Sequence, residues 1–213
     1  MTLVDEELLV KSRERVKSYG EVFTPRHMVE QMLDLVSDDL DGPGFVDKTF
    51  LEPAAGDGNF LIAILRRKLA AVEKTIEPAL WPQESLFVLA SIYGIELLED
   101  NHQDAQALML AEFIDFHQRH GVACGPRTHL HRAAAFLIAT NIVRGNTLTG
   151  QDWRGEDIEF SWWNRDPDQP GVVRREPFTF FSLREESMFD LAVYAMYAPC
   201  PINQVHQEVR SDG

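Results

Sequence analysis

The stretch that most constrains the fold is residues 51–60, which read Leu-Glu-Pro-Ala-Ala-Gly-Asp-Gly-Asn-Phe. A short apolar lead-in precedes it, and apolar residues at helical spacing follow it. This order predicts a strand, a tight turn and a helix. Gly56 and Gly58 can adopt positive φ and let a ligand approach the main chain closely, while the first amides of the helix form a positively polarised pocket of donors. Glu52, at the tip of the strand, places a carboxylate on the rim of that pocket.

Two common phosphate-binding motifs are excluded at this turn. No Gly-Lys-Ser/Thr follows it, as a P-loop requires, and the third glycine of the dinucleotide fingerprint is absent. The sequence Glu-Pro-Ala-Ala-Gly-Asp-Gly-Asn-Phe instead resembles the S-adenosylmethionine-binding motif of class I methyltransferases. Its Glu-Pro-Ala opening and its closing Phe60 are similar to the variant in the N6-adenine DNA methyltransferases of restriction-modification systems.

Residues 1–18 read as a charged amphipathic helix, which is either a solvated surface element or an arm that contacts a partner or DNA. A second helix is predicted to start at Thr24 and Pro25, because threonine caps helices and proline at the first helical position has no N–H to leave unpaired. Apolar residues three and four apart continue this helix to Leu40. Asp-Gly-Pro-Gly at 41–44 ends it.

Residues 20–25 read Gly-Glu-Val-Phe-Thr-Pro and resemble a second signature of the same family, Gly-x-x-Phe-Thr-Pro. In that family this segment lies upstream of the glycine motif and packs beside the cofactor, and its threonine contacts the methionine end. The resemblance therefore implies this role for Phe23 and Thr24. Two motifs in the order of the family are more specific than either motif alone.

A second strand is predicted at residues 86–97, an apolar run rich in β-branched and aromatic residues that ends in Gly-Ile-Glu-Leu. Glu96 at its tip is either a surface carboxylate or a ribose ligand, since a carboxylate can accept hydrogen bonds from both sugar hydroxyls. The glycine turn upstream favours the ribose ligand.

Residues 101–119 are predicted to form a helix with one apolar face, and a third strand is predicted to end near residue 148. The end of that strand, Gly-Asn-Thr-Leu, resembles the third cofactor motif of the family, in which an Asp or Asn side chain meets the adenine amino group. Here the amide oxygen of Asn146 is the expected acceptor. The resemblance implies these S-adenosylmethionine-binding residues: Phe23, Thr24, Glu52, Ala54, Gly56, Gly58, Phe60, Glu96, Leu97, Asn146 and Thr147.

One cluster consists of residue types that bind zinc, namely His117, His120, Cys124, His129 and His131. Their spacing matches no compact metal motif. Histidines on a helix surface and in loops are therefore the favoured interpretation, and no metal is expected.

Residues 150–187 are predicted to form an irregular insertion between strands. They contain tryptophans, arginines and a turn rich in proline and aspartate. Aromatic residues beside arginines either stack on bases or belong to a small β-hairpin that covers the sheet, and the hairpin is favoured.

Residues 189–193, Phe-Asp-Leu-Ala-Val, are predicted as the fourth strand. In amino-methyltransferases this strand leads to Asn (or Asp)-Pro-Pro-Tyr/Phe, whose first side chain accepts a hydrogen bond from the target amino group and whose aromatic ring stacks on the flipped-out base. Here the acceptor position falls on Ala195 and the aromatic position on Ala198. Tyr194 and Tyr197 remain as stacking candidates, but no catalytic residue is identified.

The 213 residues predict one α/β domain over 19–213. A net charge of −14 and a pI near 4.8 argue against tight unaided binding to duplex DNA, because neutralisation of phosphates supplies most of that affinity. No membrane span or signal peptide is expected. Cys124 and Cys200 are too few for a disulfide framework, so the cytoplasm is the expected compartment.

The resemblance implies a Rossmann-like class I methyltransferase sheet with helices on both faces, incomplete at its C-terminal edge because the chain ends at Gly213. The first hypothesis is an adenine N6 DNA methyltransferase, or the cofactor-binding portion of one. In this hypothesis another chain, such as a partner methyltransferase or a specificity subunit, helps it to bind DNA. The second is a catalytically silent relative that acts as a regulatory, scaffold or anti-restriction subunit. The third is a methyltransferase for small molecules or proteins.

Overall fold

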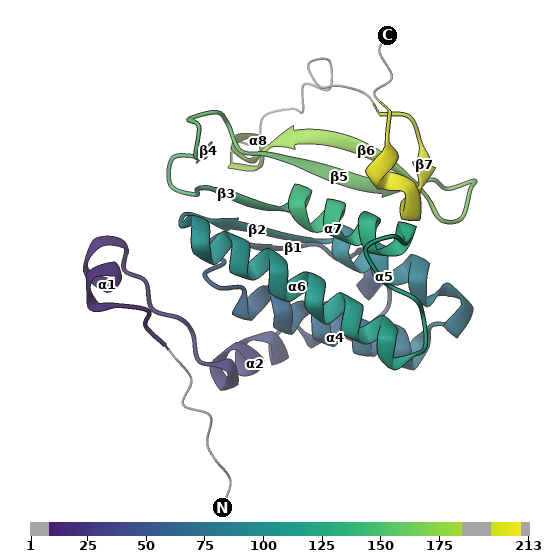
Figure 1. Ribbon diagram of the computed structural model, residues 1–213, viewed down its shortest axis with the longest axis horizontal. Helices are drawn as coiled ribbons and strands as arrows, with labels where there is room; N and C mark the ends of the chain where they lie inside the picture. The colour runs from purple at the N-terminus through teal and green to yellow at the C-terminus, as the bar shows by residue number, and fades with distance from the viewer. Residues whose placement is uncertain (1–8, 185–196, 210–213) are drawn as a thin grey trace, which may run out of the picture.

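A computed structural model describes residues 9–184 and 197–209 (Figure 1). The helices are α1 (Arg13–Tyr19), α2 (Arg26–Asp34), α3 (Ser37–Asp41), α4 (Asn59–Thr75), α5 (Trp81–Ala90), α6 (Glu99–Arg119), α7 (His129–Asn141) and α8 (Phe180–Arg184), with 3-10 helices η1 (Phe45–Asp47), η2 (Pro78–Leu80) and η3 (Ile202–Gln207). The strands are β1 (Phe50–Glu52), β2 (Ile92–Glu96), β3 (Ile142–Asn146), β4 (Gln151–Asp152), β5 (Glu159–Arg165), β6 (Val172–Thr179) and β7 (Cys200–Pro201).

The first sheet is mixed and has the strand order β1-β2-β3-β4. β1, β2 and β3 are parallel, and β4 runs antiparallel to β3. Helices occupy both connections between the parallel strands, as crossovers of this kind usually require. Among the described residues β1 pairs with β2 alone, so β1 forms one edge of this sheet. The predicted α/β fold is confirmed, as are the helix over residues 101–119 and the third strand, which is β3 after α7.

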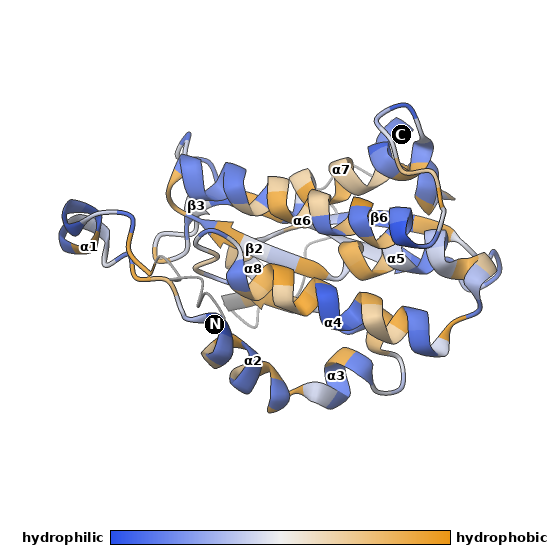
Figure 2. Cartoon of the chain, turned by 60° about the horizontal axis from the view of Figure 1, so that its bottom comes forward, coloured by the Kyte–Doolittle hydropathy of each residue, from blue (hydrophilic) through white to orange (hydrophobic). Residues whose placement is uncertain are grey.

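The two faces of the parallel strands are covered differently (Figures 1 and 2). On one face lie α4 and α6: a β-carbon at Gly94 would lie 3.1 Å from Leu61 of α4. The neighbouring Tyr93 points to the opposite face, where its hydroxyl donates to the carbonyl of Ser161 at 2.8 Å and its ring packs edge-on against Phe160. The sequence predicted helices on both faces. In the described structure this second face instead carries the β5–β6 hairpin, with the short α8 beside it.

Within the stretch predicted at 150–187, the described residues 150–184 are more regular than predicted. β5 pairs antiparallel over its whole length with residues 173–179 of β6, which confirms the favoured hairpin and corrects the description of this stretch as irregular. Arg165 ties the hairpin to the helical layer: its guanidinium donates to Glu84 of α5 and to Asp47 of η1, each at 2.7 Å. It also lies 3.6 Å from the centre of the Phe87 ring.

Residues 86–90 were predicted as a strand but belong to helix α5, and β2 begins only at Ile92. All five of these residues are buried. A helix that is apolar on every side lacks the helical period of polar and apolar residues, so a short run of this kind cannot be told from a buried strand by pattern.

The N-terminal helix is shorter than predicted. α1 starts after Ser12, whose hydroxyl accepts from the amide of Arg15 at 3.1 Å, and ends at Gly20, which has a φ of 68°. Residues 9–12 are not helical, and residues 1–8 lie outside the described part of the chain. α1 buries no residue, and Figure 2 shows it as largely hydrophilic.

The helix predicted from Thr24 to Leu40 is interrupted. α2 begins at Arg26 with Pro25 as its N-cap and no side-chain capping bond, so Thr24 does not cap it. The helix is interrupted at Leu35 and Val36, between α2 and α3, because Val36 adopts a non-helical conformation. The strand predicted at 189–193 lies outside the described residues. Across residues 9–184 and 197–209, no helix has the length and apolar character needed to cross a membrane.

Candidate functional site

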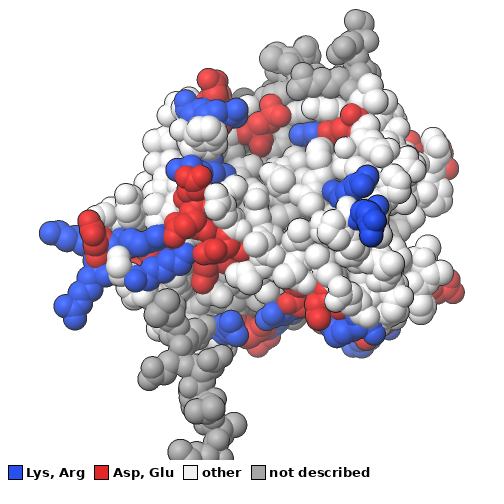
Figure 3. All heavy atoms as spheres, in the orientation of Figure 1, with Lys and Arg blue, Asp and Glu red and all other residues white. Residues whose placement is uncertain are grey.

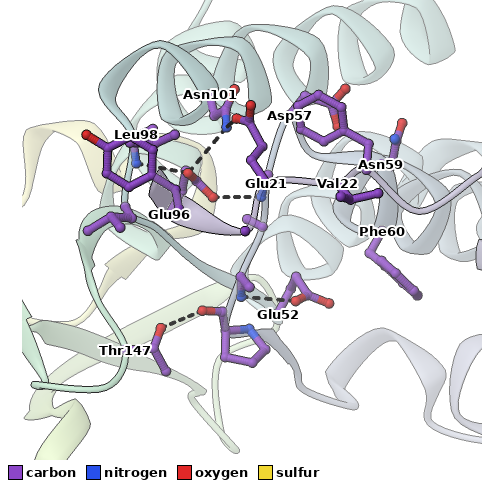
Figure 4. Close-up of a pocket in the computed structure, with 18 of the residues that line it drawn as sticks. Glu21, Val22, Glu52, Asp57, Asn59, Phe60, Glu96, Leu98, Asn101 and Thr147 are labelled. Carbon is purple, nitrogen blue, oxygen red and sulfur yellow. Dashed lines mark hydrogen bonds between the residues drawn. The ribbon is translucent and has the colours of Figure 1, made fainter. Parts of the chain in front are cut away.

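A cleft of about 610 Å³ opens at the carboxyl ends of β1, β2 and β3 (Figure 4). Its walls are residues 19–24, the turn at 52–60, residues 96–98 with Asn101, and residues 145–148. Parallel strands bring their carboxyl ends to one edge of the sheet, and open α/β sheets bind their ligands at that edge. The volume is in the range of small-molecule sites.

The glycine turn forms the floor of the cleft and has the backbone that its sequence predicts. Gly56 has a φ of 56° and Gly58 a φ of 95°. A β-carbon at Gly56 would lie 3.3 Å from the ring of Phe23, and one at Gly58 would lie 3.0 Å from the Cα of Ala105 in α6. The turn is therefore held between the N-terminal segment and α6, and both conformation and space require glycine there.

The Glu96 carboxylate joins the ends of β1 and β2. It is 7% exposed. One oxygen accepts from the amide of Gly56 at 2.7 Å, and the other accepts from the amide of Leu98 at 2.9 Å and from Asn101 at 3.4 Å. A carboxylate has about four acceptor positions, so this group orders the site while it keeps limited capacity for a ligand.

The ends of β1 and β3 are tied together across the cleft. The Thr147 hydroxyl donates to the carbonyl of Pro53, and the Asn146 amide oxygen accepts from the amide of Leu148 at 2.9 Å. Glu52 accepts from the amide of Ala54 at 3.0 Å. The amide oxygen expected to meet an adenine amino group is thus already engaged once, and it keeps a second lone pair.

Phe23 and Thr24 bring the N-terminal segment to the glycine turn. Phe23 is buried, and its amide donates to the carbonyl of Leu9 at 2.9 Å. Thr24 lines the cleft. All the residues predicted from the sequence to bind a cofactor line this one cleft, except Gly58, which faces α6.

The cleft is acidic. Glu21, Glu52, Asp57 and Glu96 line it, and no lysine or arginine does so among the described residues. Burial raises the pKa of Glu52 and of Asp57, and one carboxylate oxygen of Asp57 is buried without a hydrogen-bond partner. Burial alone would raise the pKa of Glu21, but hydrogen bonds from Arg15 and Asn101 lower it.

No protein-family model, curated protein or solved structure matches this chain. What the cleft binds therefore has to be inferred from its own chemistry.

Sequence reasoning missed several residues that line the cleft: Tyr19, Glu21, Val22, Asp57, Asn59, Leu98, Asn101 and Leu148. Asp57 and Asn59 were within reach of prediction, since both lie inside the glycine motif. Asn101 carries no signal of its own, because a single polar residue in the first turns of a helix is ordinary.

The histidine and cysteine cluster does not form a metal site in the described structure, where no group of three or more metal-binding side chains comes together. His117 was expected on a helix surface, but it is fully buried, and its Nε2 lies 3.0 Å from the Ser85 hydroxyl. Burial lowers its pKa to about 4. Cys124 is also buried.

The region of the missing catalytic tetrapeptide is described only in part. Tyr194 and Ala195 lie outside the described residues. Ala198 is exposed, and the Tyr197 ring lies 4.6 Å from the guanidinium of Arg175 and does not line the cleft.

Proposed function

We propose that the cleft binds S-adenosylmethionine. The observation that carries this proposal is the charge of its lining, in which four carboxylates and no basic residue surround a glycine turn among the described residues. Arg15, outside the lining, pairs with one of the four, Glu21. S-adenosylmethionine carries a sulfonium and an ammonium against one carboxylate, so it is a net cation. Dinucleotides and nucleoside triphosphates bring several negative charges, which this lining repels.

The arrangement of the site supports a Rossmann-like class I methyltransferase fold. Two parallel strands, β1 and β2, end in Glu52 and Glu96, and the glycine turn after β1 hydrogen-bonds to the second of these carboxylates. In this proposal Glu96 receives the ribose, Asn146 the adenine, and Phe23 and Thr24 the methionine end. Two free cysteines suit a reducing compartment, the cytoplasm.

We assign methyl transfer to adenine N6 in DNA as the reaction that this site serves, following the resemblance of residues 20–25 and 52–60. The net charge of −14 opposes binding of duplex DNA by this chain alone. A partner methyltransferase or specificity subunit therefore supplies the DNA contacts.

A specific observation favours a second candidate, a catalytically silent subunit with a regulatory, scaffold or anti-restriction role. Ala195 and Ala198 stand where the family has an acceptor and an aromatic residue, and alanine provides neither function. The two candidates share the cofactor cleft and differ only in chemistry.

Calorimetric titration of the purified chain with S-adenosylmethionine, NAD⁺ and ATP tests the proposal. We expect micromolar binding of S-adenosylmethionine alone, weakened at least about tenfold by Glu96→Gln, since the new amide nitrogen, a donor, would face the backbone amide of either Gly56 or Leu98. Glu99→Gln is the matched control, because Glu99 lies three residues further along the chain, does not line the cleft and pairs with Arg144.

Equal or tighter binding of ATP or NAD⁺ would overturn the assignment, as would no binding of S-adenosylmethionine. Incubation of binding-competent protein with DNA, a candidate partner chain and labelled cofactor then separates the two candidates. Label in adenine N6 identifies an enzyme, and binding without transfer identifies the silent subunit.

A further inference from the structure

The N-terminal segment 9–24, here called the arm, forms one wall of the cleft while its fastening points lie on α6. Lys11 donates to Asp100 at 3.1 Å and to Asp104 at 2.9 Å. Arg15 donates to Asp100 at 2.6 Å. Figure 3 shows the basic side chains of the arm meeting acidic side chains where the arm joins the body of the molecule. Charge pairing therefore contributes much of the attachment of the arm.

Asn101 of α6 is the point where the arm meets the cleft. It is 1% exposed. Its amide nitrogen donates to Glu21 of the arm at 2.7 Å and to Glu96 at 3.4 Å, and its oxygen accepts from Lys11 at 2.7 Å. Each polar atom of this side chain is thus bonded to the arm, and its nitrogen also reaches the carboxylate at the end of β2.

The arm in turn holds Glu21 in place. The Arg15 guanidinium donates two hydrogen bonds to that carboxylate, at 2.6 and 2.7 Å, and the Glu21 side chain is 7% exposed. A continuous chain of hydrogen bonds therefore runs from Arg15 through Glu21 and Asn101 to Glu96, and from Glu96 to the amide of Gly56. Figure 4 shows Glu21, Asn101 and Glu96 in the cleft.

We propose that Asn101 is a positioning residue for Glu96 and that it couples docking of the arm to binding in the cleft. The proposal rests on the proposed function, because the ligand that reports the coupling is S-adenosylmethionine. A docked arm completes the wall formed by residues 19–24 and fixes the orientation of the Glu96 carboxylate. Coupling is reciprocal, so a ligand that binds more tightly to the docked state must also hold the arm down by the same factor.

The test combines calorimetry with hydrogen exchange of residues 15–23, with and without S-adenosylmethionine. We expect Asn101→Ala and Arg15→Gln each to weaken binding about tenfold, a typical coupling. The ligand should slow exchange of the arm in the wild type and fail to slow it in Asn101→Ala. Arg15 belongs to the arm and does not line the cleft, so Arg15→Gln removes its bonds to Glu21 and Asp100 without truncating a buried side chain of α6.

Two variants serve as matched controls. Arg13→Gln changes an exposed basic residue of the same helix α1, and Gln103→Ala changes an exposed residue of α6 that does not line the cleft. Both should bind S-adenosylmethionine within twofold of the wild type.

Binding by Asn101→Ala and Arg15→Gln within twofold of the wild type would overturn the coupling while the cofactor assignment stands. So would exchange of the arm that does not respond to bound ligand in the wild type. Failure of the wild-type chain to bind S-adenosylmethionine would overturn both the coupling and the proposed function.

Discussion

The ammonium of Lys68 lies 2.6 Å from the hydroxyl of Ser91, and both side chains are buried. Lys68 also donates to the carbonyl of Lys48 at 2.6 Å. One amine on α4 therefore joins the segments that enter β1 and β2, at the end of the sheet opposite the cleft. Burial lowers the pKa of Lys68 to about 7.

The lowered pKa of Lys68 predicts that the protein becomes more stable as the pH rises above 7. The unfolded chain holds the proton up to the ordinary lysine pKa of 10.5, whereas the folded chain releases it near 7. Raising the pH from 7 toward 10.5 therefore favours folding, by at most ~1.4 kcal/mol per pH unit from this group. Urea unfolding of the wild type and of Lys68→Met between pH 7 and 9.5 should show that slope in the wild type alone. Lys74→Met, exposed on the same helix, should keep it.

The lowered pKa of His117 predicts that the protein becomes less stable at acidic pH. Its pKa falls from 6.5 to about 4 on folding, mainly through burial, so the unfolded state binds more protons between these values. Stability should therefore fall as the pH drops from about 6.5 toward 4. His117→Phe fits a site bordered by Phe113 and Phe116 and leaves Ser85 bonded to the carbonyl of Pro82. The unfolding free energy should fall more between pH 7 and pH 4.5 in the wild type than in the variant. An equal fall in the two proteins would contradict this prediction.

Gly58→Ala should destabilise the fold. The new methyl group would lie 3.0 Å from the backbone of Ala105, at a φ of 95°. We expect a loss of about 2–3 kcal/mol in thermal or urea unfolding, the sum of backbone strain and steric conflict. Gly121→Ala isolates the strain, because Gly121 has a φ of 71° and open space around its β-position. Equal losses in the two variants would show that the contact with α6 costs nothing.

Arg165→Met should loosen the β5–β6 hairpin from the helical layer. Loss of the charge-assisted bonds to Glu84 and Asp47 should cost about 1–3 kcal/mol in unfolding free energy. Hydrogen exchange should quicken across residues 159–179 and leave β2 unchanged. Arg174→Met, which alters an exposed residue of β6, should leave both measurements near the wild-type values.

The acidic lining predicts that protons compete with a cationic ligand. Because burial raises the pKa of Glu52 and Asp57, these carboxyls gain protons at a higher pH than exposed ones. Lowering the pH from 7 to 5 should weaken binding of S-adenosylmethionine by about threefold more than binding of S-adenosylhomocysteine, or ~0.7 kcal/mol of charge interaction. The two ligands differ in the sulfonium charge. Parallel pH profiles in calorimetry would show that the carboxylates do not sense that charge.

Local signals predicted the glycine turn well, since the positive φ at Gly56 and Gly58 and the helix after them depend on neighbouring residues. Residues 86–90 were assigned wrongly, because a helix that is buried on every side has the same apolar pattern as a buried strand. Thr24 was assigned a cap that it does not form, since α2 starts two residues later, at Arg26, with Pro25 as its N-cap.

The arm and Asn101 could not be predicted for a different reason. The bonds from Lys11 and Arg15 to α6 join residues more than 80 positions apart. Charged residues at such separations have many possible partners, and only the folded chain selects among them.

α1 is attached to the molecule without burying any of its own residues. The cleft can therefore be disturbed while the fold stays intact. Screening shortens the reach of surface charges from ~10 Å in 0.1 M salt to ~3 Å in 1 M salt, while burial of the apolar core is not weakened. A preparation in concentrated salt can therefore keep its circular dichroism spectrum and melting temperature although the exposed pairs of Lys11 with Asp100 and Asp104 are weakened, while the buried Phe23 keeps the end of the arm at the glycine turn. For this protein, evidence of folding is no evidence of a formed site, and buffer composition belongs among the variables of every binding assay.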